Sequence, residues 1–77
     1  MTITNHVIKR FQERITYESP EVIRSFIESD LKYSKQLYRL NNIEKRKRND
    51  IIYVVNYTQK SNPIVITLYL ESEFLKI

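Results

Sequence analysis

The chain has 77 residues, a net charge of +4 at pH 7, no cysteine and a single histidine. A chain of this length buries only about 60% of the surface that it exposes when unfolded, so we expect one domain over residues 1–77 with a thin core. The composition excludes disulfides and thiolate zinc sites, and one histidine among scattered carboxylates is poor material for other metal sites. We therefore expect no metal and no cofactor.

The location and partners of the protein follow only in outline from the sequence. No apolar run is long enough to span a bilayer, and the N-terminus lacks the basic-then-apolar pattern of a signal peptide. We therefore expect no membrane association and a cytoplasmic protein. The many Ile, Lys, Asn and Tyr residues suit an AT-rich genome, that of a bacterium or of a phage in its host. The excess of basic over acidic residues favours anionic partners.

Apolar spacing predicts two helices in the first half of the chain. Over residues 5–15 one stripe repeats at helical intervals, and Thr4 or Asn5 can cap the helix start. Over residues 20–32 a second stripe follows Ser19, which is a suitable cap, and Pro20, which suits a first helical turn. The two stripes consist of Val7, Ile8, Phe11 and Ile15, and of Val22, Ile23, Phe26, Ile27 and Leu31.

The second half of the chain predicts strands, at residues 34–40, 43–48, 51–57 and 64–70. Residues 51–57 are too apolar for an edge and indicate a central strand. Asn49–Asp50 suits a two-residue hairpin turn, which makes residues 43–48 a strand, although a solvated loop is the alternative. The predicted fold class is α+β, with two N-terminal helices packed on a three- to four-stranded antiparallel sheet.

His6, Arg10 and Arg14 follow one another at intervals of four residues in the first predicted helix. Such residues form one row at the edge of the apolar stripe, where they border the sheet. Two guanidinium groups could hold a phosphate, and an imidazole can transfer a proton at neutral pH. The alternative is a charged surface in which Glu13 and Glu18 pair with the basic side chains.

Basic and aromatic residues elsewhere suggest a nucleic-acid surface. The run EKRKR could follow a phosphate backbone without sequence preference, or it could be a solvated edge strand protected by its charges. Tyr38 beside Arg39 is the best candidate for stacking on a base. The candidate nucleic-acid-binding residues are Lys9, Tyr38, Arg39, Lys45, Arg46, Lys47 and Arg48.

The order of these features resembles a known family. A His-x3-Arg-x3-Arg-Ile helix, a second helix opening with SPEVI, then LYRL, a central apolar strand and a last strand ending in VITLY are similar to RelE- and BrnT-type toxins. These toxins share the fold of the barnase, colicin and RelE ribonucleases. The match covers nearly the whole chain, from His6 to Tyr69, on loose motifs. Ile15 and Thr16 stand where the family usually has a glycine.

The resemblance implies a metal-independent endoribonuclease that acts on RNA phosphodiesters, on or off the ribosome, and that a cognate antitoxin restrains. By position it implies the catalytic residues His6, Arg10, Arg14, Thr67 and Tyr69. A second proton-transfer group would be needed, and Tyr38, Tyr53, Tyr69 and Glu13 are the candidates.

The alternative is a non-catalytic bacterial or phage protein that binds and inhibits a host protein or a nucleic acid. Residues 71–77 could form a third helix, a homodimer surface or a partner contact.

Overall fold

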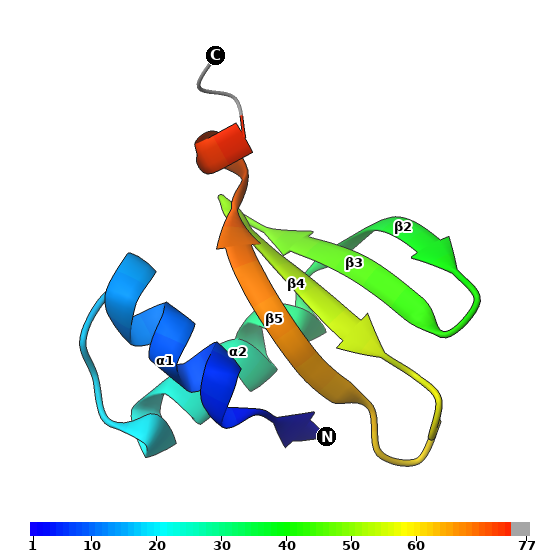
Figure 1. Ribbon diagram of the computed structural model, residues 1–77, viewed down its shortest axis with the longest axis horizontal. Coiled ribbons are helices and arrows are strands. Elements are labelled where there is room, and N and C mark those ends of the chain that lie inside the picture. Colours follow the sequence, from blue (N-terminus) through cyan, green and yellow to red (C-terminus); the bar gives the residue numbers. More distant parts are fainter. Residues whose placement is uncertain (75–77) are drawn as a thin grey trace.

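Two helices and a five-stranded sheet make up residues 1–74, the part of the chain that the computed structural model describes (Figure 1). The α+β class is confirmed. The elements are β1 (Thr2–Ile3), α1 (Asn5–Arg14), α2 (Pro20–Lys32), β2 (Lys35–Leu40), β3 (Ile43–Arg48), β4 (Ile51–Asn56), β5 (Ile64–Leu70) and the 3-10 turn η1 (Glu71–Phe74).

The sheet has the strand order β1-β5-β4-β3-β2, with β4 in the interior. Neighbouring strands from β5 to β2 pair antiparallel, but β1 pairs parallel with β5. The prediction of three to four antiparallel strands is therefore corrected to five strands in a mixed sheet. Strand β1 has two residues, too few for a period-two pattern, and long-range pairing alone defines it.

Hydroxyl caps fix the start of both helices. The Thr4 Oγ1 atom accepts a hydrogen bond from the Val7 N–H at 3.2 Å, and Ser19 Oγ accepts one from the Val22 N–H at 3.3 Å. These bonds satisfy backbone donors that have no partner inside the helix.

The core lies between the two helices and one face of the sheet. Buried residues of α1 and α2 cluster with alternate residues of the strands: Ile3, Val7, Ile8, Phe11, Ile23, Ile27, Leu31, Ile51, Tyr53, Val55, Val65 and Leu68. The predicted stripe of α2 is too wide, because Val22 and Phe26 are 51% and 44% exposed. Phe26 contacts Phe11 edge to face, with ring centroids 5.2 Å apart.

The opposite face of the sheet carries no helix, and we call it the helix-free face. Ile52 and Val54 are buried but do not belong to the core cluster, so they point to this face. In the strand register, Val54 lies between Lys45 and Thr67, and Ile52 lies between Lys47 and Tyr69.

Two short asparagine turns connect the paired strands β2, β3 and β4. Asn41–Asn42 joins β2 to β3, and Asn49–Asp50 joins β3 to β4. Residues 43–48 therefore form a strand and not a loop. This strand pairs on both sides, so the alternative that EKRKR is a solvated edge strand is wrong, and the edge strands are β1 and β2. Of the predicted tail, residues 71–74 form η1, whereas residues 75–77 lie outside the described part.

Candidate functional site

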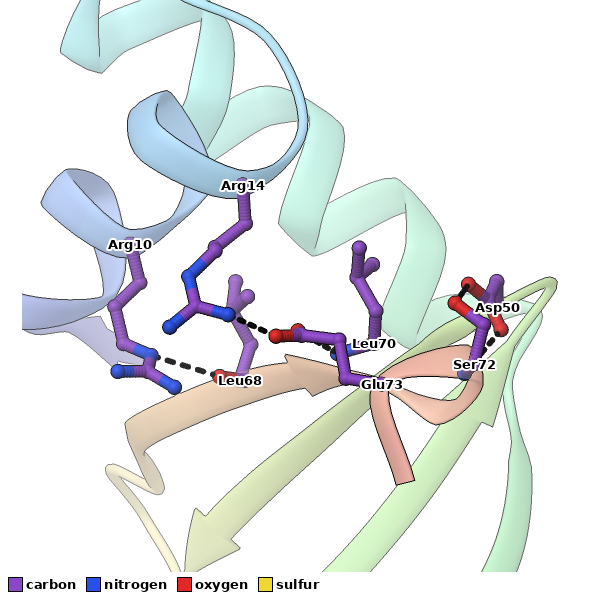
Figure 2. A network of polar contacts seen from close by, with 7 residues as sticks. All are labelled: Arg10, Arg14, Asp50, Leu68, Leu70, Ser72 and Glu73. Atoms are coloured by element: carbon purple, nitrogen blue, oxygen red, sulfur yellow. Dashed lines mark hydrogen bonds and ion pairs between the residues drawn. The ribbon is translucent and has the colours of Figure 1, made fainter. Parts of the chain in front are cut away.

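The row of His6, Arg10 and Arg14 lies along the outer edge of β5. His6 Nε2 is 3.2 Å from Thr67 Oγ1, and the Arg10 Nε–H donates to the Leu68 carbonyl oxygen at 3.1 Å. Arg14 pairs with the carboxylate of Glu73, in the turn that follows β5. Figure 2 shows both arginine side chains directed at the end of this strand. The three residues, spaced four apart on α1, thus make successive contacts along β5 and the turn that follows it.

These contacts have a structural role, because β1 pairs with only Ile64 and Val65 of β5. Farther along the edge, backbone groups of β5 need other partners. Arg10 supplies a donor for the Leu68 carbonyl, and the Leu70 N–H donates to Glu73 Oε1 at 3.1 Å (Figure 2). The row therefore attaches α1 to the part of β5 that β1 leaves unpaired.

The contact of His6 with Thr67 joins residues that are 61 positions apart. Tyr69 lies two residues farther along β5, on the same face as Thr67 and at a distance of about 6.6 Å along the strand. All three were implied as catalytic by the resemblance, and the fold brings them to one corner of the sheet.

The other candidates for the second proton-transfer group lie elsewhere. The Tyr53 hydroxyl is buried and donates to Asp30 Oδ2 at 2.6 Å. Tyr38 belongs to β2, at the opposite edge of the sheet. Glu13 follows His6 by two helical turns, or about 10 Å along the α1 axis. Of the four candidates, only Tyr69 shares the corner with His6.

Two rows of side chains cross the helix-free face from β2 to β5. The strand register aligns Tyr38, Lys45, Val54 and Thr67 in the first row, and Lys35, Lys47, Ile52 and Tyr69 in the second. The Lys45 ammonium is 5.6 Å from the centre of the Tyr69 ring. His6 stands at the end of the first row. This face combines cations with an aromatic ring and an apolar centre.

The basic run of β3 does not form a continuous strip, because successive strand residues point to opposite faces. Lys45 and Lys47 point to the helix-free face, whereas Arg46 points to the helix side. There Arg46 donates from Nε to Ser34 Oγ at 2.6 Å and from Nη2 to the Ser34 carbonyl at 2.8 Å. Arg46 is thus used within the protein.

Three other candidate nucleic-acid-binding residues occupy separate surroundings. Arg39 lies on the helix side, with its guanidinium carbon 5.0 Å from the centre of the Tyr57 ring. The guanidinium carbon of Arg48 is 5.9 Å from the centre of the Tyr33 ring. Lys9 is exposed on α1.

A buried carboxylate lies under Arg46. Glu44 is 3% exposed; its Oε2 is 3.3 Å from Arg46 Nη1, while its Oε1 has no hydrogen-bond partner among residues 1–74. Burial raises the pKa of Tyr57, and the nearby Glu44 carboxylate acts in the same direction. Glu44 and Arg46 belong to β3, two strands away from β5, where His6 makes its contact.

Sequence reasoning missed a pocket at the opposite end of the second row. Its lining includes Tyr33, Lys35 and Leu37, none of which belongs to the candidate set. Lys35 stands outside the conspicuous EKRKR run, and only strand pairing brings it beside Lys47.

Neither family models, nor curated proteins, nor solved structures match this chain. Within residues 1–74, no helix is long and apolar enough to cross a membrane. The same part of the chain holds no group of three or more His, Cys, Asp or Glu side chains that could bind a metal ion.

Proposed function

We propose that this protein is a toxin-like, metal-independent endoribonuclease that binds RNA on its helix-free face. The observation that carries the proposal is the contact of His6 with Thr67 beside Arg10, at the end of a basic and aromatic row. Metal-free cleavage of an RNA phosphodiester needs a proton acceptor, a proton donor and positive charge at the phosphorane, and imidazole, hydroxyl and guanidinium groups can supply them.

RNA supplies its own nucleophile in this reaction. The His6 imidazole takes the proton of a 2′-hydroxyl, whose oxygen attacks the adjacent phosphorus. The 5′-oxygen then leaves with a proton from the Tyr69 hydroxyl. The products are a 2′,3′-cyclic phosphate and a 5′-hydroxyl end.

Arg10 is the candidate for stabilising the charge on the phosphorane. Among the described residues, only its Nε–H has a hydrogen-bond acceptor, the Leu68 carbonyl, so four of its five N–H groups remain for phosphate oxygens. Arg14 is paired with Glu73, and this exposed pair is worth only about 0–1 kcal/mol. A phosphate group can therefore compete for Arg14.

The test is cleavage of end-labelled RNA by the purified protein in the presence of EDTA. We expect cyclic phosphate ends, and a rate that falls about 100-fold or more for His6→Ala, the range for loss of a general base. Arg24→Ala, an exposed change on α2, is the control and should cleave normally. Expression of the wild type, but not of His6→Ala, should stop bacterial growth. Intact RNA together with normal growth would refute catalysis.

A second function, non-catalytic binding, is favoured by one observation: Arg10 and Arg14 already have acceptors within the protein. In that case the row serves only to attach α1, and the lysines of the helix-free face bind a nucleic acid or a host protein. Capture of the partner should then survive His6→Ala and be lost when Lys45 and Lys47 are both changed to Glu. Either function is compatible with a cognate inhibitor or with a homodimer.

A further inference from the structure

A pocket of about 380 Å³ opens between the start of β2 and the end of β3. Its lining residues are Tyr33, Lys35, Leu37, Lys47, Arg48 and Asn49. The volume lies within the range of about 300–1,000 Å³ that is usual for small-ligand sites. The pocket and the His6 corner lie towards opposite edges of the sheet, because β2 and β5 are three strand spacings, or about 14 Å, apart. It is therefore a separate feature of the surface.

The pocket concentrates positive charge that the protein balances only in part. Lys35 and Lys47 are directly opposite each other in the β2–β3 register, and like charges in this relation destabilise a sheet. Lys47 is neutralised by Glu71, whose Oε1 is 2.7 Å from its ammonium. Among residues 1–74, no carboxylate oxygen lies within 4.0 Å of the charged groups of Lys35 or Arg48. Lys35 and Arg48 therefore leave positive charge available for a bound anion.

An aromatic ring and an aliphatic side chain stand beside these cations. Tyr33 follows the end of α2 and is 63% exposed, and the Arg48 guanidinium carbon is 5.9 Å from the centre of its ring. The register shift between Gln36 and Tyr38 makes Leu37 an extra residue in β2, and Leu37 is 46% exposed. Flat and apolar surface next to unbalanced positive charge suits a planar base attached to a phosphate better than it suits a carboxylate alone.

We infer that this pocket binds one nucleotide of a single-stranded RNA, with the phosphate on Lys35 and Arg48 and the base against Tyr33 and Leu37. This inference deepens the proposed function, because it depends on RNA as the ligand. An RNA strand held here and at His6 would run along the second row, over Lys47 and Ile52, towards Tyr69. The pocket thus positions the strand at a distance from the bond that is cleaved.

The test is fluorescence anisotropy with a labelled single-stranded RNA of about 10 nucleotides, within the span of about 4–16 nucleotides that one single-strand-binding domain covers. The full chain carrying His6→Ala is used, so that the probe stays intact. Tyr33→Ala and Lys35→Gln are compared with two control changes, Tyr17→Ala and Lys60→Gln, which remove the same side chains from exposed positions outside the pocket. Circular dichroism checks the fold, and Tyr33→Leu replaces Tyr33→Ala if that variant fails to fold.

We expect Tyr33→Ala to weaken binding at least about fivefold, the lower end for loss of one stacked base, and both controls to stay within about twofold. Lys35→Gln should weaken binding and flatten its dependence on salt. Equal affinities for all four variants would overturn the inference. Weakening by Lys35→Gln but not by Tyr33→Ala would also overturn it, because it would show general attraction of the RNA without a base site.

The binding assay can refute the pocket independently of the proposed catalytic function. If the wild type leaves RNA intact but Tyr33→Ala weakens binding, the pocket stands and catalysis does not. If RNA is cleaved at His6 but the pocket variants bind normally, the endoribonuclease stands and the pocket does not.

Discussion

The bond between Tyr53 and Asp30 is the most buried polar contact of the described residues. Tyr53 is fully buried on β4, Asp30 is 8% exposed on α2, and their oxygens are 2.6 Å apart. A buried carboxylate without a donor would cost more than the bond gains, so this contact fixes α2 against the sheet. Burial raises the pKa of the Tyr53 hydroxyl well above its ordinary value of 10, and the hydrogen bond and charge of Asp30 act in the same direction.

Replacing this hydroxyl should destabilise the fold in a pH-dependent way. We expect Tyr53→Phe to lower the free energy of unfolding by about 1–3 kcal/mol at pH 7, because it leaves Asp30 buried without its donor. The pKa of Tyr53 is raised in the folded state, so its contribution is complete below about pH 10 and is lost as the pH rises further. The wild type should therefore lose more stability between pH 9 and 11 than Tyr53→Phe does.

Urea unfolding at several pH values measures both effects. Tyr17→Phe is the control, because Tyr17 is 81% exposed, and its stability should follow that of the wild type. Parallel alkaline losses in the wild type and in Tyr53→Phe would contradict the assignment.

At the scale of the elements, two asparagines replace the glycines that hairpin turns usually need. The first residue of each turn has a positive φ, 55° at Asn41 and 54° at Asn49, and the chain has no glycine at all. Asparagine tolerates this left-handed conformation better than other residues with a Cβ atom. These turns hold β2, β3 and β4 in register, and therefore align the rows of the helix-free face.

Alanine at either position should cost about 1–2 kcal/mol of stability, the penalty of the left-handed region for an ordinary residue. Glycine should be neutral or slightly stabilising. Thermal or urea unfolding measures the difference. Asn42→Ala is the matched control, because Asn42 lies in the same turn without a positive φ. If Asn41→Ala and Asn42→Ala cost the same, the backbone explanation is wrong.

At the scale of the whole molecule, the two faces of the sheet differ in composition. The helix side holds the core, while the helix-free face carries Lys35, Lys45 and Lys47 in a chain of net charge +4. Cations on one face attract a phosphate backbone, and binding then releases the counterions of the nucleic acid. The affinity for RNA should accordingly depend on salt.

With Lys35, Lys45 and Arg48 on phosphates, about three contacts, the logarithm of the binding constant should fall with that of the salt concentration at a slope of about −2. Anisotropy over a range of potassium chloride concentrations measures this slope. Changing Lys45 to Gln should make the slope shallower by about 0.7, whereas Lys60→Gln should not change it. A slope near zero would exclude phosphate contacts as the source of affinity.

The local elements can be predicted from the sequence alone. Apolar periodicity located both helices, and β-branched runs located β4 and β5, because burial of one side of an element leaves a regular pattern in its own residues. Capping by Ser19 and turn formation at Asn49–Asp50 are equally local, since they depend on neighbouring backbone groups. The α+β class followed from the order of these patterns.

How distant segments meet depends on the packing of the whole chain. Strand β1 forms only because it pairs with β5. The residues that contact His6, Arg10 and Arg14 lie about 60 positions away in the sequence; they are Thr67, Leu68 and Glu73. The alternation of EKRKR could be predicted, but which face each cation occupies depends on where the helices pack. The pocket beside Lys35 likewise requires the β2–β3 register. Periodicity records what one segment buries, whereas a site depends on which segments the packing brings together.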